Sequence, residues 1–238
     1  MAGDQAVESA IPARAVAIYA HPDDPEVSCG GTLARWTAAG SEVHLVVANQ
    51  GDKGSLDPTT DPAALAAERA AEVERAAEVL GVASVEHLGY PDGELDDDAE
   101  LRARIVATIR RHRPNALVAP DPTAVFFGDS YVNHRDHREL GWAVLDSLVP
   151  AASPLYHPDA GPAHHVGLVL LSGTLEPDAW VDVTGHLDRK VAAVSCHRTR
   201  VGEDPGLVAS VLEARAAEEG RRAGVPMAEA FRRLRLVP

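Results

Sequence analysis

The fold of this chain is set by the stretch AVAIYAHPDDPEVSCGGT, residues 15–32. Residues 15–20 form a short apolar run, which is typical of a buried strand. Polar residues follow directly from His21, and Asp24-Pro25-Glu26 is a good helix start. It places an aspartate at the N-cap, proline at the first helical position and an acid in the first turn. The stretch therefore predicts a strand, a polar turn and a helix.

The same alternation of strand and helix continues along most of the chain. Further apolar runs predict strands over residues 43–49, 85–90, 116–120, 166–172 and 180–183. Helical patterns lie at about residues 26–39, 62–80, 98–112, 134–148, 186–199 and 207–223. We expect one Rossmann-like α/β domain over residues 1–238, with a mostly parallel sheet flanked by helices on both faces. No GxGxxG motif follows the first strand, so dinucleotide binding has little support.

Composition narrows the class of protein. The chain has 238 residues, 45% of them hydrophobic and 24% charged, which is ordinary for a soluble globular domain. A net charge of −14 disfavours nucleic acid and anionic membranes as partners. The two cysteines form no CxxC pair, which favours a reducing compartment. The acidic N-terminus lacks a run long enough for a signal peptide or membrane helix, so we expect a cytoplasmic protein. The sequence leaves open whether the protein forms a homo-oligomer.

Three long connections, residues 50–61, 121–133 and 150–165, are expected to serve function, because loops of this length are uncommon in compact domains. The first two follow strands, as does the segment 21–31. Ligands of open α/β sheets bind outside the carboxyl ends of the strands, so these segments should meet there. We expect residues 50–61 and 150–165 to choose the substrate, although neither has a readable specificity.

The first group of reactive residues is His21-Pro22-Asp23-Asp24, one imidazole and two carboxylates at a strand end. Divalent metals take such ligands. A helix start alone would explain Asp24, but it would not explain His21 or Asp23. Gly30 and Gly31 lie inside the predicted helix, where glycine costs about 1 kcal/mol relative to alanine. They indicate close approach of a ligand or, equally, close helix packing.

The second group is Asn133-His134-Arg135-Asp136-His137. Asn133 is a plausible N-cap for the following helix, so His134 and His137 project to one side of its first turn. An exposed polar helix start is the alternative. Together the two groups offer two histidines and an aspartate as metal ligands, with a position left open for water, as in catalytic zinc sites. The remaining groups are available as a base and an acid.

These motifs resemble those of the LmbE-like or PIG-L family of zinc-dependent deacetylases. HPDDPEVSCGGT, residues 21–32, is similar to the family's first motif, and NHRDH, residues 133–137, to its second. The resemblance extends through NQGDKGS, the Arg69 and Glu72 helix, LGYPDGEL and PDAWVDVTGHLDRKVAAVSCH, and so covers nearly the whole chain.

The resemblance implies a role for each matching residue. The metal ligands would be His21, Asp24 and His137, and Asp23 would be the general base. His134 would stabilise the oxyanion and act as an acid. Asp136 would orient and charge His134, while Arg69 and Asp92 would contact the sugar.

The chain also departs from the family pattern. Pro25 stands where a glutamate often follows the two aspartates, and we expect no effect because that position is not a ligand. Val132 stands where some members carry a tyrosine, with Tyr131 beside it, which leaves that oxyanion donor unassigned. The family's His-x-Ser-Gln segment is His197-Arg198-Thr199-Arg200 here, and its role is open.

The resemblance implies hydrolysis of the N-acetyl group of an N-acetylglucosamine-type sugar, with zinc as cofactor and a small amino-sugar conjugate as substrate. A His2Asp site also suits iron or cobalt. Two alternatives are an amidase for a larger thiol- or sugar-conjugate amide, and a metal- or sugar-binding protein without turnover. Asp23 and His134 argue against the second, since metal binding needs neither.

Overall fold

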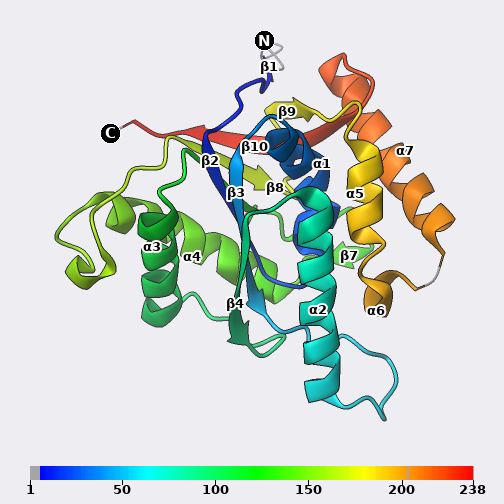
Figure 1. The fold of residues 1–238 in the computed structure, drawn as a ribbon, viewed down its shortest axis with the longest axis horizontal. Coiled ribbons are helices and arrows are strands. Elements are labelled where there is room, and N and C mark those ends of the chain that lie inside the picture. Colours follow the sequence, from blue (N-terminus) through cyan, green and yellow to red (C-terminus); the bar gives the residue numbers. More distant parts are fainter. Residues whose placement is uncertain (1–5, 203, 238) are drawn as a thin grey trace.

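The sheet that carries the fold has eight strands in the order β1-β9-β10-β8-β5-β2-β3-β4, in a computed structural model that describes residues 6–202 and 204–237 (Figure 1). Its strands are β1 (Ala6–Val7), β2 (Arg14–Tyr19), β3 (Glu42–Asn49), β4 (Ser84–Tyr90), β5 (Ala116–Pro120), β8 (Leu168–Ser172), β9 (Ala179–Asp182) and β10 (Ala228–Arg235). Strand β10 runs antiparallel to β8 and β9, and the other neighbours are parallel. Two short strands, β6 (Phe126–Phe127) and β7 (Tyr131–Val132), form a separate hairpin.

Helices cover both faces of the sheet, which explains why its central strands are apolar on both sides. One face holds α1 (Asp24–Ala38), α2 (Pro62–Leu80), α5 (Leu187–Val194) and α7 (Pro205–Ala223). The other holds α3 (Ala99–His112) and α4 (Arg135–Ala152). In β2, Ala17 and Tyr19 join the core of the first face, while Val16 and Ile18 join that of the second. The predicted α/β fold with a mostly parallel sheet is confirmed.

Some boundaries differ from the prediction. Helix α1 begins at Asp24 with Asp23 as its N-cap residue, so the prediction of Asp24 as the N-cap was wrong. The predicted helix over 186–199 is two helices, α5 and the short α6 (Arg198–Val201), because the chain turns to bury His197. Strand β10 was not predicted, since its sequence AEAFRRLR lacks an apolar run.

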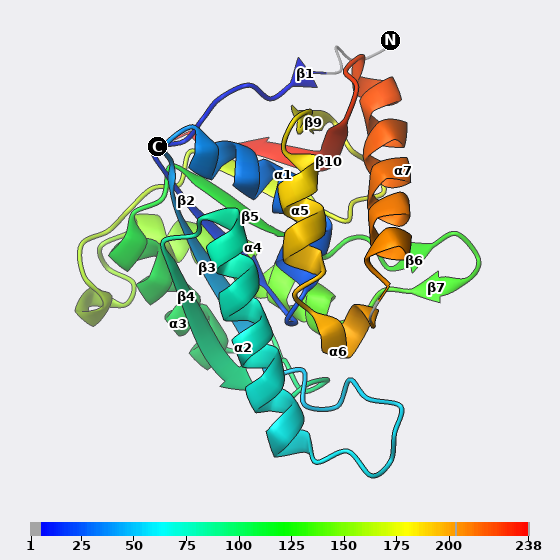
Figure 2. The ribbon, with the colours of Figure 1, turned by 45° about the vertical axis from the view of Figure 1, so that its right-hand side comes forward.

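The carboxyl ends of β2, β3, β4, β5 and β8 gather at one edge of the sheet, as expected for the site. Figure 2 shows α6 at this edge, between the β6–β7 hairpin and the loop that precedes α2. No helix of the described residues is both long and apolar enough to cross a membrane.

The connection over residues 150–165 lies elsewhere. It contains the 3-10 helix η1 (Pro158–Ala160), and it is held by Arg110 at the end of α3. The buried Arg110 guanidinium donates to the carbonyl oxygens of Pro150, Ala151, Ser153, Tyr156, His157 and Gly161. None of these residues lines the cleft described below, so the expectation that this loop chooses the substrate was wrong.

Candidate active site

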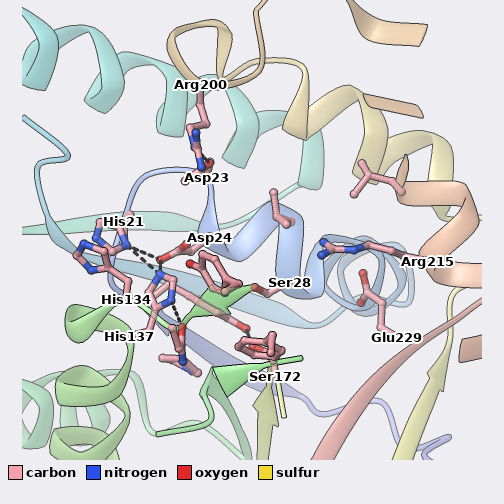
Figure 3. Close-up of a pocket in the computed structure, with 18 of the residues that line it drawn as sticks. His21, Asp23, Asp24, Ser28, His134, His137, Ser172, Arg200, Arg215 and Glu229 are labelled. Carbon is pink, nitrogen blue, oxygen red and sulfur yellow. Dashed lines mark hydrogen bonds and ion pairs between the residues drawn. The ribbon is translucent and has the colours of Figure 1, made fainter. Parts of the chain in front are cut away.

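Three electron-pair donors converge at the carboxyl edge of the sheet. His21 Nδ1 lies 3.0 Å from His137 Nε2, and Asp24 Oδ2 lies 3.1 Å from each of these nitrogens (Figure 3). Zinc at its usual bond lengths in tetrahedral geometry separates its ligands by about 3.3 Å. The three atoms therefore fit a single divalent ion, and the donor set suits zinc.

The protonation of both histidines is set by groups on their outer sides. His137 Nδ1 lies 2.8 Å from Asn133 Oδ1, and the Asn133 amide nitrogen donates to Ala124 O at 2.7 Å. Because Ala124 O can only accept, the Asn133 oxygen faces His137 and accepts the Nδ1 proton. His137 Nε2 then carries a free lone pair that points at the other two donors. This is the usual arrangement behind a metal-bound histidine. Asn133 is therefore not the helix N-cap that the sequence predicted; that residue is His134.

Two carboxylates lie behind His21. Its Nε2 is 3.2 Å from Asp92 Oδ1 and 3.6 Å from Asp136 Oδ2. A proton on Nε2 leaves the Nδ1 lone pair for a metal. The hydrogen bond from His21 also lowers the pKa of Asp92. Asp92 thus contacts His21, a predicted metal ligand. The family resemblance had implied only a contact with the sugar for Asp92.

Asp136 is fully buried and its carboxylate is well satisfied. It accepts from Asn49 Nδ2 at 2.9 Å and from the backbone N–H of Gly93 at 2.8 Å. Its own backbone N–H donates to His134 Nδ1 at 3.2 Å. Within the described residues, no hydrogen bond joins the Asp136 carboxylate to the His134 ring. Asp136 thus holds the His134 ring through its backbone N–H, while its carboxylate lies 3.6 Å from His21 Nε2. The role of Asp136 toward His134 stays a prediction.

His134 has one ring nitrogen occupied and one available. Since Nδ1 accepts from the Asp136 N–H, the ring proton belongs on Nε2, from which it can be donated. Burial and the neighbouring His21 lower the pKa of His134. The neutral, Nε2-protonated ring is therefore favoured at neutral pH, in place of the imidazolium that the resemblance implied.

Asp23 is held in a strained backbone conformation beside the converging donors. Its φ of 93° lies in the left-handed region, which costs a non-glycine residue about 1–3 kcal/mol and is concentrated at functional sites. Burial, with a further contribution from Asp24, raises the pKa of Asp23 to about 7. A carboxylate with such a pKa is suited to accept a proton near neutral pH.

The Asp24 carboxylate has different partners from the Asp23 carboxylate. Its Oδ2 accepts from the His21 backbone N–H at 2.8 Å in addition to facing both histidine rings. Burial alone would raise the pKa of Asp24, but His137 and His21 hold it well below its usual range. Asp24 therefore stays ionised, as a metal ligand must.

Arg69 lies buried under the loop that follows β3. Its Nη2 donates to Gly54 O at 3.1 Å, and its Nε has no partner among the described residues. A Cβ atom at Gly51 or Gly54 would meet the Arg69 guanidinium, and Gly51 also has a φ of 62°, which favours glycine. Arg69 lines the same cleft as the converging donors.

The segment His197-Arg198-Thr199-Arg200 links α6 to the site. His197 Nε2 lies 3.2 Å from Glu26 Oε2, with both residues buried. Thr199 donates through N–H and hydroxyl to Glu72, at 2.9 and 2.6 Å. These contacts place Arg200 Nε 3.6 Å from Asp23 Oδ2 (Figure 3). The sequence singled out the segment 197–200 through the family resemblance, but it did not predict this link to Asp23.

Gly30 and Gly31 are explained by packing. A Cβ at Gly30 would meet the Lys190 side chain, and one at Gly31 would meet Val183 and Glu229. Helix α1 is kinked at Cys29, and the Glu229 carboxylate accepts the Gly31 backbone N–H at 2.9 Å. Of the two readings left open by the sequence, close packing is the one that the structure supports.

Most of the site's side chains line one cleft of about 1400 Å³: His21, Asp23, Asp24, Arg69, Asp92, Asn133, His134, His137 and Arg200. Its rim includes Leu56 from the loop before α2, and Phe127 and Tyr131 from the β6–β7 hairpin. The site residues predicted from the sequence thus come together: all except the buried Asp136 line this cleft, and Asp136 lies beside His21.

Comparison with known proteins identifies relatives of the same kind. The family model PIG-L, described as GlcNAc-PI de-N-acetylase, matches residues 16–148. Diacetylchitobiose deacetylase of Thermococcus kodakarensis is 31% identical over 195 residues, which cover 80% of this chain and 71% of that protein. A 1D-myo-inositol 2-acetamido-2-deoxy-alpha-D-glucopyranoside deacetylase of Kineococcus radiotolerans is 33% identical over 172 residues, and the chain spans only 46% of its length.

Solved structures show the same relationship. N,N'-diacetylchitobiose deacetylase from Pyrococcus horikoshii superposes with a TM-score of 0.85 at 29% identity, covering 94% of this chain and 84% of that one. The 4-carboxy-2-hydroxymuconate hydratase GalB of Pseudomonas putida KT2440 gives a TM-score of 0.78 at 22% identity, covering 94% of this chain and 98% of that one. The second likeness concerns the fold alone, since one fold hosts several chemistries. The predicted family and, at the level of that family, the predicted reaction class are confirmed: this chain belongs to the PIG-L family of deacetylases.

Proposed function

We propose that this chain is a zinc-dependent deacetylase that removes the acetyl group from an N-acetylglucosamine-type sugar conjugate. The observation that carries the proposal is the convergence of His21 Nδ1, Asp24 Oδ2 and His137 Nε2 within 3.0–3.1 Å of one another. The presence of Asp23 beside this group favours a hydrolase over a protein that only binds metal, because metal binding alone does not need this carboxylate. The names of the relatives supply the substrate class.

His21, Asp24 and His137 would hold the ion. A bound divalent ion supplies polarisation of the amide carbonyl and a lowered pKa for water. Asp23 takes a proton from the water that attacks the carbonyl carbon, a role for which its raised pKa is suited. His134 Nε2–H donates a hydrogen bond to the developing oxyanion, and the amine leaves with the proton that Asp23 took from the water.

The outer groups keep this arrangement in place. Asn133 holds His137, while Asp92 and Asp136 hold His21, so neither ligand ring can rotate freely. Arg69 and Asp92 would also contact the sugar, as the resemblance implies. The cytoplasmic location and the oligomeric state stay predictions.

The test is acetate release from N,N'-diacetylchitobiose and N-acetylglucosaminyl-inositol, with metal content measured on the same preparations. We expect about one zinc per chain, loss of activity with a chelator and recovery when zinc is added back. Iron and cobalt are tested in parallel, since the donor set also accepts them.

Asp23→Asn serves as the matched control, because it removes the base and leaves the three ligands untouched. Zinc-loaded protein that releases no acetate from either substrate would contradict the proposed function. Full activity after complete metal removal would contradict the metal assignment.

A further inference from the structure

Asp92 lies in a tight turn that follows β4, so its side chain points where that turn directs it. Glu94 closes the turn, because its backbone N–H donates to Pro91 O at 3.3 Å. Gly93 has a φ of 80°, the conformation that a turn of this kind requires at its third residue. A functional side chain on a loop is placed less precisely than one on a strand unless other groups support it. The question is therefore what holds this turn.

The loop over residues 50–61 holds both backbone groups of Asp92. The Asp92 N–H donates to Asp52 Oδ1 at 2.8 Å, and Asp92 O accepts from Lys53 Nζ at 2.8 Å. Lys53 Nζ also donates to Glu94 Oε1 at 2.5 Å, in the same turn. Two consecutive residues of one loop thus fix the main chain of Asp92 at its N–H and at its carbonyl.

The Asp92 carboxylate joins the proposed metal site to the cleft. Its Oδ1 lies 3.2 Å from Nε2 of the predicted ligand His21. Its Oδ2 has no hydrogen bond or ion pair to any group within residues 6–202 and 204–237, and Asp92 lines the cleft. One oxygen can therefore stay on the His21 proton while the other accepts from a hydroxyl of the sugar. Both contacts depend on the position of the same turn.

Asp52 can influence these contacts only through the groups that it holds. It is half-buried and does not line the cleft, whereas the next residue, Lys53, does. Within the part of the chain that the structure describes, its carboxylate makes one hydrogen bond, to the Asp92 N–H. A change at Asp52 thus removes one support of Asp92 without removing a group that a substrate could touch.

A second link between the same two loops does not involve Asp92. Gln50 Nε2 donates to Gly89 O at 2.9 Å, and the Gln50 N–H donates to Tyr90 O at 2.9 Å. The Gln50 side chain is exposed and does not line the cleft. It therefore serves as a matched control, which separates attachment of the loops in general from the hold on Asp92.

We infer that Asp52 is a positioning residue: by fixing the main chain of Asp92, it keeps one Asp92 oxygen on His21 and the other toward the sugar. The contact with the sugar rests on the proposed function, but the contact with His21 does not. Without Asp52 the Asp92 N–H loses its acceptor, and the turn can move. Both contacts of the Asp92 carboxylate then weaken together.

The test is a double-mutant cycle of Asp52→Ala and Asp92→Ala, because such a cycle measures whether two residues act through each other. Zinc affinity is measured by competition with a chelator, and kcat/KM is measured with N,N'-diacetylchitobiose. Asp52→Ala should lower each by about two- to tenfold, the scale of one hydrogen bond. Asp92→Ala should weaken zinc binding by about tenfold or more, as expected for an outer partner of a ligand. Adding Asp52→Ala to Asp92→Ala should change either value by less than about twofold.

Two further variants separate positioning from a general loss of stability. Asp52→Asn keeps an oxygen that can accept from the Asp92 N–H, so both values should stay within about twofold of the unsubstituted protein. Gln50→Ala removes the other side-chain link and should also leave both values unchanged. Urea unfolding identifies the variants that fold. Should Asp52→Ala not fold, Asp52→Glu takes its place in the cycle, since its acceptor lies one bond further from the backbone.

The inference is overturned if Asp52→Ala keeps normal zinc affinity and kcat/KM, or if its effect is undiminished in the Asp92→Ala background. It is also overturned if Gln50→Ala or Asp52→Asn is as defective as Asp52→Ala. In each of these cases hydrolysis by the unsubstituted protein leaves the proposed function intact. If the unsubstituted protein hydrolyses no amide, the proposed function fails, and the zinc affinities of the same four proteins of the cycle still decide whether Asp52 positions Asp92.

Discussion

Replacing Asn133 tests whether the groups behind the ligands control metal binding. The Asn133 side chain, only 6% exposed, makes two hydrogen bonds with different purposes. Its oxygen holds His137 Nδ1 at 2.8 Å, and its nitrogen satisfies the carbonyl of Ala124 at 2.7 Å. Alanine removes both bonds, while aspartate keeps the oxygen that faces His137 and loses the donor to Ala124.

The two contacts predict different magnitudes for the two variants. Loss of an outer partner of a metal-bound histidine costs about 10–100-fold in metal affinity, which is about 1.4–2.7 kcal/mol. Loss of the donor to Ala124 O leaves a carbonyl unsatisfied, which costs about 1–3 kcal/mol of folding stability. Asn133→Ala should therefore lose both affinity and stability. Asn133→Asp should lose stability but keep zinc affinity within about threefold, because its carboxylate still accepts from Nδ1.

Zinc affinity would be measured by competition with a chromogenic chelator, and stability by urea unfolding of the metal-free proteins. His137→Ala is the control for loss of a ligand itself and should bind zinc more weakly than either variant. The reasoning is refuted if Asn133→Ala holds zinc as tightly as the unsubstituted protein. It is also refuted if Asn133→Asp loses as much affinity as Asn133→Ala.

Three further predictions concern other parts of the chain. Asp23→Asn should keep its metal and lose at least about a hundredfold in kcat, whereas Asp24→Ala should lose the metal; equal metal loss in both would make both aspartates ligands. Burial lowers the pKa of His112 to about 4, so the folded state binds fewer protons than the unfolded state between that value and about 6.5. Stability should fall as pH drops through this window, and urea unfolding at pH 7 and pH 5 should show a smaller fall for His112→Gln; an unchanged fall would exclude this residue. Arg110→Ala strands several carbonyls and should cost about 3 kcal/mol or more, with faster proteolysis within residues 153–161; normal stability would contradict the role of this arginine.

The parts of the fold that periodicity determines could be predicted from the sequence. The apolar runs of the central strands are buried on both faces, so their composition alone marks them, and β5 has the expected bounds, residues 116–120. Strand β10 was not predicted because charged residues interrupt its apolar pattern. The Arg232 side chain pairs with Glu176, and the Arg235 side chain pairs with Glu8.

The site could be predicted only as far as its ligand types and its place. His21 and His137 follow from their motifs and from the edge of the sheet at which those motifs end. The partner of each ring nitrogen depends on contacts between distant segments of the chain. Such contacts leave no periodic pattern in the sequence. Asp136 illustrates this limit: it is one residue from His137, but its carboxylate turns to Asn49 and Gly93 from other loops.

The distance along the chain between the proposed ligands has a thermodynamic consequence. His21 and His137 are 116 residues apart in sequence, so an unfolded chain presents both to one ion only at the entropic cost of closing that loop. An ion that binds only the folded state adds its binding free energy to the stability of that state, about 2.7 kcal/mol at a free concentration 100 times Kd. The midpoint of thermal unfolding then depends on the free metal concentration, and a molecule that loses the ion should become both inactive and easier to unfold.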